Sequence, residues 1–156
     1  MTKEQFDQQI ISLRSMLYYV SYGLLTNPMD QDDAVQEAIH KALVKRNSLR
    51  DDSHFKSWLT RILINECYNI LRRRTREAPT EEIMPQAPPD ANREVFDSLV
   101  TLDVKLRLPI ILHYYEGYTT KEIAGILRVP EGTIKGRLVS ARKQLGQLLH
   151  DEEVLA

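Results

Sequence analysis

Apolar residues in the first half of the chain recur every three or four positions, which is the spacing of one buried face of an α-helix. In the first segment the repeating positions are Phe6, Ile10, Leu13, Leu17, Val20 and Leu24. The pattern predicts helices over residues 4–26, 30–46 and 53–74, and no strand. Asn27-Pro28 should end the first helix, Asp30 should cap the second, and Asp52 or Ser53 should cap the third.

The helical spacing continues in the second half of the chain. It predicts helices over residues 92–102, 103–115, 120–127 and 131–149. Asp103 can cap the helix that follows it, and Pro109 should kink that helix. Thr119 and Glu122 match the capping box that opens a helix. The expected apolar stripe of this short helix is Ile123, Ala124 and Leu127. The predicted fold class is therefore all-α.

A proline-rich acidic segment separates the two groups of helices. Four of the seven prolines fall within residues 77–91, at Pro79, Pro85, Pro88 and Pro89. Because proline fixes φ and lacks an amide donor, this segment is predicted to be extended. We therefore expect two small helical domains, residues 1–76 and 92–156, joined by an acidic linker over residues 77–91.

Composition and charge narrow the class of protein. With 156 residues, 42% hydrophobic and 28% charged, the chain resembles an ordinary soluble protein. It has no apolar run long enough for a bilayer and no secretory layout at its start, so a cytoplasmic protein without membrane insertion is expected. The formal net charge of −1 is the sum of four unequal segments. They carry +3 over residues 1–76, −6 over 77–103, +5 over 104–149 and −3 over 150–156. Two basic blocks favour a nucleic-acid partner.

Catalytic and metal-binding residues are not expected. The single cysteine, Cys67, excludes an internal disulfide and a cysteine-rich zinc site. His40, His54, His113 and His150 show no metal-ligand spacing, and no carboxylates cluster. The sequence therefore predicts no enzyme, no metal and no cofactor.

The last two predicted helices form the sharpest pattern. The core face of the second consists of Ile134, Leu138, Ala141, Leu145 and Leu148. Two helices joined by a short turn, the second with a basic outer face, are typical of a helix-turn-helix. The residues suited to reach base edges are Lys135, Val139 and Ser140, and those suited to phosphates are Arg137, Arg142 and Lys143. The alternative is a solvated basic face on a plain helical hairpin.

Two further helix faces carry candidate contacts. On the third helix one stripe holds Trp58, Arg61, Asn65, Tyr68, Asn69 and Arg72. Aromatic rings among guanidinium and amide groups suit single-stranded nucleic acid, although half-buried core edges are the alternative. The second helix has the polar face Asp32, Asp33, Gln36, Glu37 and Lys41. That face is either solvated or a docking face for a basic protein.

These segments together resemble bacterial RNA polymerase sigma factors of the extracytoplasmic-function group. The matching segments are DDAVQEAIHKAL, HFKSWLTRILINECYNILRRR and LDVKLRLPIILHYYEGYTTKEIAGILRVPEGTIKGRLVSARKQL. The resemblance implies a protein that binds core RNA polymerase, through its clamp helices and flap, and directs it to promoters. It also makes an anti-sigma factor a plausible partner, and places the acidic linker in the RNA channel of the polymerase.

The resemblance also implies roles for particular residues. The residues that resemble the polymerase-docking face are Asp32, Asp33, Gln36 and Glu37. Those that resemble the element reading and melting the minus-10 sequence, with a loop pocket for a flipped base, are Asn47, Ser48, Lys56, Trp58, Arg61, Asn65, Tyr68 and Arg72. Those that resemble the minus-35 reader are Thr119, Thr120, Lys135, Gly136, Arg137, Val139, Ser140, Arg142 and Lys143.

The chain departs from the family pattern at two reading positions. Gly136 stands where the family commonly has serine, and Ser140 stands where it commonly has arginine. Upstream base contacts are therefore expected to be fewer, with more of the affinity coming from phosphates. The alternative function is an autonomous helix-turn-helix regulator that binds duplex DNA as a dimer.

Overall fold

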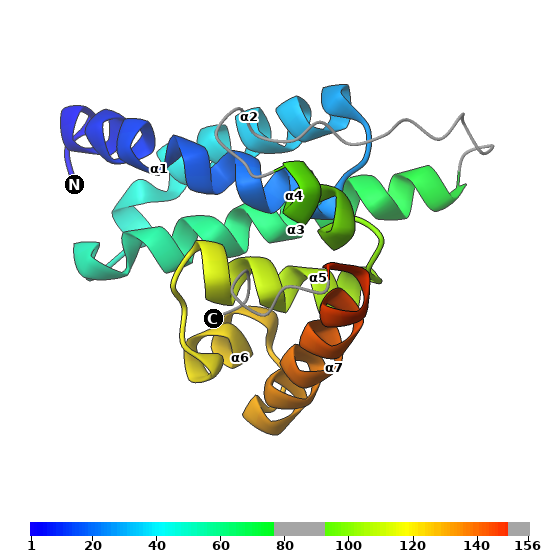
Figure 1. The fold of residues 1–156 in the computed structure, drawn as a ribbon. Coiled ribbons are helices and arrows are strands. Elements are labelled where there is room, and N and C mark those ends of the chain that lie inside the picture. The colour runs from blue at the N-terminus through cyan, green and yellow to red at the C-terminus, as the bar shows by residue number, and fades with distance from the viewer. Residues whose placement is uncertain (77–92, 150–156) are drawn as a thin grey trace. The chain divides into compact units, whose positions relative to one another are not determined.

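The computed structural model describes residues 1–76 and 93–149 (Figure 1). Contacts divide the chain into two compact units, Met1–Gln86 and Ala87–Ala156. The described residues form helices and turns without a strand, which confirms the all-α fold class. The predicted linker, residues 77–91, lies outside the described residues.

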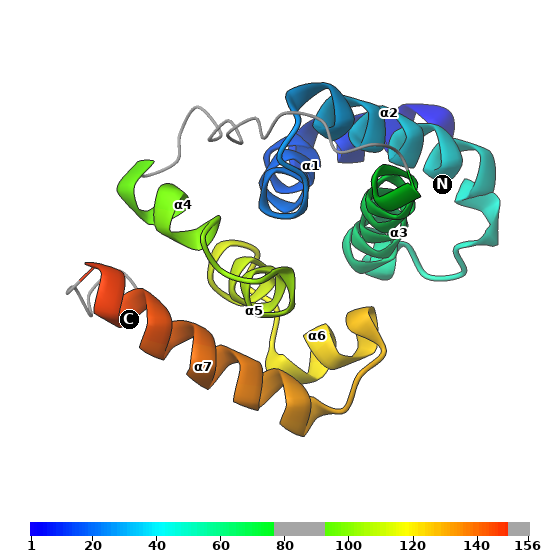
Figure 2. The ribbon, with the colours of Figure 1, turned by 90° about the vertical axis from the view of Figure 1, so that its right-hand side faces the viewer.

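Residues 1–76 form three α-helices around one apolar core (Figure 2). The elements in order are α1 (Lys3–Leu24), α2 (Pro28–Lys45), 3₁₀ turns at Arg46–Ser48 and Asp52–His54, and α3 (Phe55–Arg76). Leu17 and Leu24 of α1 are fully buried, as their helical spacing predicted. The ring of Phe6 meets the ring of Phe55 edge to face, with centroids 5.7 Å apart. This contact joins the start of α1 to the start of α3.

The cap of α2 differs from the predicted one. Asn27, not Asp30, caps this helix: its Oδ1 accepts hydrogen bonds from the backbone N–H of Met29 at 2.8 Å and of Asp30 at 3.4 Å. Pro28 occupies the first turn, where its missing N–H and fixed φ suit a helix start. The prediction treated Pro28 only as the end of the preceding helix, and so placed the start of α2 too late.

The cap before α3 also lies one residue earlier than predicted. Asp51 accepts hydrogen bonds from the backbone N–H and the hydroxyl of Ser53, at 3.0 and 2.7 Å. The 3₁₀ turn that follows runs directly into α3 at Phe55. Asp52 is therefore inside the turn rather than its cap, because Asp51 closes the turn over the residue two positions on.

Two ion pairs fix α2 against α3. Arg74 donates to both carboxylate oxygens of Asp30, from Nε at 2.9 Å and from Nη2 at 2.7 Å. Lys41 donates to the buried side chain of Glu66. Because Asp30 precedes Lys41 on α2, whereas Arg74 follows Glu66 on α3, the two helices run antiparallel.

Residues 93–149 form four α-helices and a π-helical turn. The elements in order are α4 (Arg93–Leu99), α5 (Val104–Ile110), the π-helical turn η3 (Ile111–Tyr115), α6 (Thr120–Leu127) and α7 (Glu131–Leu149). α4 ends at Leu99 and not near Leu102 as predicted. Asp103 caps α5 as predicted, because its Oδ1 accepts a hydrogen bond from the Lys105 backbone N–H at 2.9 Å.

The helix predicted to run from Asp103 to Tyr115 changes from α to π hydrogen bonding after Pro109. The Glu116 backbone N–H donates to the carbonyl of Ile111, five residues back, at 3.2 Å. Proline lacks a donor and its ring crowds the carbonyl four residues earlier, so the helix is disturbed next to the position where a kink was expected. The wider turn changes the direction in which the following side chains leave the helix.

The core of the C-terminal unit follows the predicted face of α7. The buried side chains of α7 are Ile134, Leu138, Ala141 and Leu145. The side chain of Leu148 lies outside the described ones. On α6, Ile123 is buried as predicted, but the second buried residue is Ile126 and not Leu127, which is half-buried with Ala124.

The turn of the helix-turn-helix contains a residue in the left-handed conformation. The capping box that opens α6 is present: Thr119 accepts from the Glu122 N–H at 3.1 Å, and Glu122 accepts from the Thr119 N–H at 3.0 Å. At the other end of α6, Arg128 has φ 57° and ψ 47°, and the next N–H, of Val129, donates to Ala124 at 3.1 Å. Glycine is the residue that adopts this conformation without strain.

Replacing Arg128 with glycine should stabilise the C-terminal unit relative to replacing it with alanine. Both Arg128→Gly and Arg128→Ala remove the same charge, but only glycine relieves the left-handed strain, which is worth about 1 kcal/mol. The free energy of unfolding of the full chain, from urea titration, measures the difference. Equal stability of the two variants would contradict a strained backbone at this position.

Candidate nucleic-acid interface

The predicted stripe on α3 lies at the surface of the N-terminal unit. The exposed members are Arg61, Asn65, Asn69 and Arg72, and the half-buried members are Trp58 and Tyr68. Arg72 donates a hydrogen bond to the Asn69 Oδ1, so two polar members of the stripe are already joined. The stripe presents amide, guanidinium and aromatic groups along one side of a single helix.

Trp58 is anchored on the core and still reaches the surface. Its ring lies against Phe55, with centroids 5.8 Å apart and planes tilted by 43°. Phe55 is itself buried against Phe6. The two alternatives for this tryptophan therefore combine: its inner side packs on the core, and its outer side is available for a partner. A ring held in this way loses little rotational freedom when a base stacks on it.

The loop between α2 and α3 brings further polar groups beside the stripe. Asn47 and Ser48 are exposed in the first 3₁₀ turn, and the Ser48 hydroxyl donates to the carbonyl of Lys45 at 2.6 Å. Lys56 is half-buried at the start of α3. Asp51 is also exposed, and the hydrogen bonds from Ser53 hold its pKa below the ordinary range. This loop is therefore polar but not uniformly basic.

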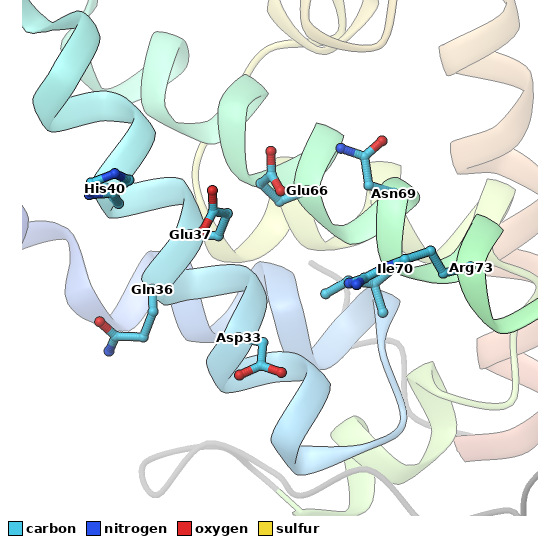
Figure 3. Close-up of a pocket in the computed structure, with 8 residues that line it drawn as sticks. All are labelled: Asp33, Gln36, Glu37, His40, Glu66, Asn69, Ile70 and Arg73. Atoms are coloured by element: carbon cyan, nitrogen blue, oxygen red, sulfur yellow. The ribbon is translucent and has the colours of Figure 1, made fainter.

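The acidic face of α2 borders an open groove (Figure 3). The groove has a volume of about 660 Å³ and is lined by Asp33, Gln36, Glu37 and His40 of α2 and by Glu66, Asn69, Ile70 and Arg73 of α3. Asp32 does not line the groove. Burial, and next the charge of Asp32, raise the pKa of Tyr22 on α1. The acidic face is thus one wall of a depression in the N-terminal unit.

Asn69 belongs to both surfaces of the N-terminal unit. It is a member of the α3 stripe, hydrogen-bonded to Arg72, and it also lines the groove. The groove and the stripe therefore adjoin along α3, so that one partner in the groove and another on the stripe would be neighbours. Sequence spacing alone did not predict that these surfaces share a residue.

The reading face of α7 is largely exposed. The exposed residues are Lys135, Gly136, Val139, Ser140 and Lys143, whereas Arg137 and Arg142 are half-buried. Val139 exposes 60% of its surface. A Cβ added at Gly136 would meet no atom within 4 Å, so this position is open. Thr119 is exposed, and its hydroxyl serves as the cap of α6.

Arg142 is held by a residue that the sequence did not single out. Its Nε donates to the Tyr114 hydroxyl at 2.6 Å, and its guanidinium lies over the same ring, 5.7 Å from the centroid. Tyr114 belongs to the π-helical turn and meets the ring of His113 edge to face at 4.9 Å. The His113 Nδ1 lies 2.7 Å from the carbonyl oxygen of Tyr118. Only the expected break at Pro109 hinted at an irregularity here.

Within residues 1–76 and 93–149, no group of three or more metal-ligating side chains comes together. Cys67 is fully buried, and this burial raises the pKa of its thiol to about 12, so it is a poor nucleophile. Across the same two ranges, every helix is too short or too polar to cross a membrane.

Comparisons with known proteins place the chain in a family. Residues 10–77 match the model of sigma-70 region 2, and residues 93–145 match that of sigma-70 region 4. These two regions define the class as sigma-70 transcription factors. The chain is 37% identical over 150 residues to the ECF RNA polymerase sigma factor SigM of Mycobacterium tuberculosis, covering 92% of this chain and 76% of that one. It is 30% identical to the sigma-E factor of Haemophilus influenzae, over 79% of this chain and 78% of the other.

A solved structure of a sigma factor supports this family assignment. The chain superimposes with a TM-score of 0.85 on the sigma factor RpoE of Bartonella quintana, crystallised with the anti-sigma factor NepR, at 29% identity and over 94% of this chain and 98% of that one. The protein belongs to the extracytoplasmic-function group of sigma-70 factors. It is a promoter-recognising sigma factor of RNA polymerase, and sigma factors are non-enzymatic initiation factors. The autonomous dimeric regulator is not favoured.

Tyr114 and Arg142 should be energetically coupled. Tyr114→Phe removes the hydroxyl that accepts from Arg142 but keeps the ring, and should lower the free energy of unfolding by about 1 kcal/mol. In an Arg142→Met background the same change should have almost no effect, because the donor is gone. Urea titration of the four proteins measures the coupling. Equal losses in both backgrounds would show that the hydrogen bond does not contribute.

Proposed function

We propose that this sigma factor uses three surfaces to bind core RNA polymerase, the minus-10 element and the minus-35 element. The acidic face of α2, with Asp32, Asp33, Gln36 and Glu37, docks on the clamp helices of core RNA polymerase. The loop before α3 and the α3 stripe read and melt the minus-10 element, through Asn47, Ser48, Lys56, Trp58, Arg61, Asn65, Tyr68 and Arg72. The helix-turn-helix reads the minus-35 element, through Thr119, Thr120, Lys135, Gly136, Arg137, Val139, Ser140, Arg142 and Lys143.

The observation that carries this division is the adjacency of groove and stripe at Asn69. A partner on the α2 wall of the groove would be positive, since Asp33 and Glu37 line that wall, whereas Arg73 lines the α3 side. DNA would instead avoid the groove and follow the stripe, where Arg61 and Arg72 are exposed. Two surfaces of opposite preference that share an edge allow the polymerase and the DNA strand to be held next to each other.

The α3 stripe suits an unpaired strand better than a closed duplex. A base stacked on a side-chain ring gains about 1–3 kcal/mol, which helps to offset the few kcal/mol needed to unstack it. Trp58 and Tyr68 supply the rings, and Arg61 and Arg72 supply charge for the phosphates between them. Asn47 and Ser48 in the neighbouring loop are the groups for a flipped base, which makes melting sequence-selective.

The remaining assignments follow from the same function. We assign residues 1–76 and 92–156 to the two promoter-contacting domains. Residues 92–156 also contact the flap of the polymerase. We assign the acidic residues 77–91 to the RNA channel of the polymerase. The protein acts in the cytoplasm, where the polymerase is, and needs no metal, cofactor or catalytic residue. The RpoE structure contains the anti-sigma factor NepR. We expect an anti-sigma partner here too.

Transcription by purified core RNA polymerase tests the function directly. Adding this protein should produce transcripts from a defined set of start sites on genomic DNA, and mapping those starts reveals the shared upstream elements. Gel filtration with core polymerase should show co-elution. A protein that ignored the polymerase and bound duplex DNA alone as a dimer would contradict the proposal.

Reversing the charge of the α2 face should abolish polymerase binding. Asp33→Lys combined with Glu37→Lys places cations where the groove is acidic, and should weaken the affinity for core polymerase at least tenfold, because like charges then face each other. Glu4→Lys combined with Asp7→Lys on α1, both exposed and outside the groove, changes the net charge equally and is the matched control, which should bind normally. Core affinity is measured by fluorescence anisotropy. Equal affinity of the wild type, the α2 variant and the α1 control would show that the polymerase does not dock on this face.

Removing the ring of Trp58 should impair promoter melting more than duplex binding. Trp58→Ala loses the stacking platform and should reduce permanganate reactivity of unpaired thymines in the open complex about tenfold, equivalent to about 1.4 kcal/mol. Trp58→Phe keeps a ring on Phe55 and should recover most of the signal. Unchanged reactivity in the alanine variant would exclude a stacking role for this side chain.

Lys135→Ala should reduce promoter-specific transcription about tenfold without changing core binding, because the side chain is exposed on a helix far in sequence from the α2 face. Run-off transcription from a mapped promoter measures the first effect, and co-elution with core polymerase measures the second. Loss of both activities together would contradict separate roles for the two domains.

A further inference from the structure

A carboxylate stands among the groups assigned to the minus-35 element. Glu131 is the first residue of α7. Its Oε1 accepts a hydrogen bond from the Thr120 hydroxyl at 2.9 Å and lies 3.5 Å from the Lys135 Nζ. One carboxylate oxygen therefore engages two of the side chains that are proposed to contact DNA, one from each helix of the helix-turn-helix.

This carboxylate keeps its negative charge. The hydrogen bond from Thr120, and next the charge of Lys135, hold the pKa of Glu131 below its ordinary value, with a smaller contribution from Lys121. The side chain of Glu131 is 43% exposed and that of Lys135 is 65% exposed. The pair is therefore a surface feature at the end of α7 that would enter the major groove.

We propose that Glu131 is a specificity-determining residue: it holds Lys135 toward base edges and keeps the ammonium group from binding the phosphates of unrelated DNA. This inference rests on the proposed function of α6 and α7. Glu131 acts through Lys135 and Thr120, and is thus a positioning residue.

The reason lies in the two ways a lysine can bind DNA. Attraction to phosphates is independent of sequence, whereas donation to guanine O6 and N7 is specific. An ammonium group has three donors. Lys135 can leave one donor on Glu131, four residues earlier on the same helix face, and direct the others to a base. To reach a phosphate it must leave Glu131, whose carboxylate then faces the polyanion alone. The pair therefore penalises unrelated DNA more than a matched site.

The rest of the reading face increases the importance of this pair. Gly136 has no side chain and Ser140 has a short one, so Lys135 is the long polar group at the start of the exposed face of α7. Arg137 and Arg142 supply charge that attracts any duplex. Discrimination then depends on how Lys135 is directed.

Glu131→Gln is the variant that tests the role of the carboxylate charge most directly. It keeps the shape of the side chain and an oxygen that can accept from Thr120, but removes the charge that pairs with Lys135. Asp97→Asn is the matched control, since Asp97 is an exposed acid of α4 and its change alters the net charge equally. Figure 2 shows α4 beside the C-terminal half of α7, whereas α6 lies beside the N-terminal half.

The test uses holoenzyme assembled from core polymerase and the full chain. Duplexes selected from a random library by the wild-type holoenzyme define the upstream element, and affinities for that element and for random duplex are then measured at several salt concentrations. Glu131→Gln should bind random duplex about three- to tenfold more tightly, with little change for the selected element, so that the specificity ratio falls by a similar factor. Asp97→Asn should leave the ratio unchanged.

A second background isolates the pair. With Lys135→Met, Glu131→Gln should no longer change the specificity ratio, because there is no ammonium group to direct. If Glu131→Gln instead strengthened both affinities by the same factor as Asp97→Asn, the residue would act only through net charge and the inference would be overturned. If the wild-type holoenzyme selected no upstream element while still binding core polymerase, the proposed function of α6 and α7 would fail first.

Discussion

The antiparallel pairing of α2 with α3 is the constraint on which the N-terminal unit depends. One helix carries the acidic face and the other carries the aromatic stripe, so the relation between the two surfaces is set by how these helices pack. Asp30–Arg74 and Lys41–Glu66 bridge the same two helices at different levels. Glu66 is buried, and breaking its pair would leave an uncompensated charge. The ion pairs thus resist sliding of α2 along α3.

Charge in this protein is arranged locally, which explains how a chain of net charge −1 can bind a polyanion. Two acidic groups beside the residues assigned to DNA are engaged by neighbours: Asp51 accepts from Ser53, and Glu131 accepts from Thr120. The acids of α2 lie on a different face, beside the groove. Over a screening length of about 8 Å at physiological salt, such local pairing matters more to a partner than the total does.

The sequence predicted the features that depend on residues close together in the chain, namely the helices and some of their caps. Helical spacing placed α1, α2, α3, α6 and α7, and the capping box of α6 was readable because its two residues are three positions apart. Asp103 was likewise found as a cap. The start of α2 was misplaced because proline serves equally well to end one helix and to begin the next, and here Pro28 begins α2 under the Asn27 cap.

The features that the sequence did not predict join residues far apart in the chain. Arg142 meets Tyr114 across 28 positions, and Arg74 meets Asp30 across 44. The spacing of apolar residues cannot predict such contacts, because they form only when the helices pack against one another. The π-helical turn is a milder case: Pro109 signalled a disturbance, but the identity of the side chain that the widened turn presents to Arg142 follows from tertiary structure alone.

The buried thiol of Cys67 has a consequence for signalling. Peroxides and disulfides react with a thiolate, and a group with a pKa of about 12 supplies almost none at neutral pH. It is also the single sulfhydryl of the chain, and it is fully buried within the N-terminal unit. Oxidising conditions would therefore leave this thiol unaltered while the protein stays folded. A redox signal that acts through thiol chemistry therefore has to be received by another molecule.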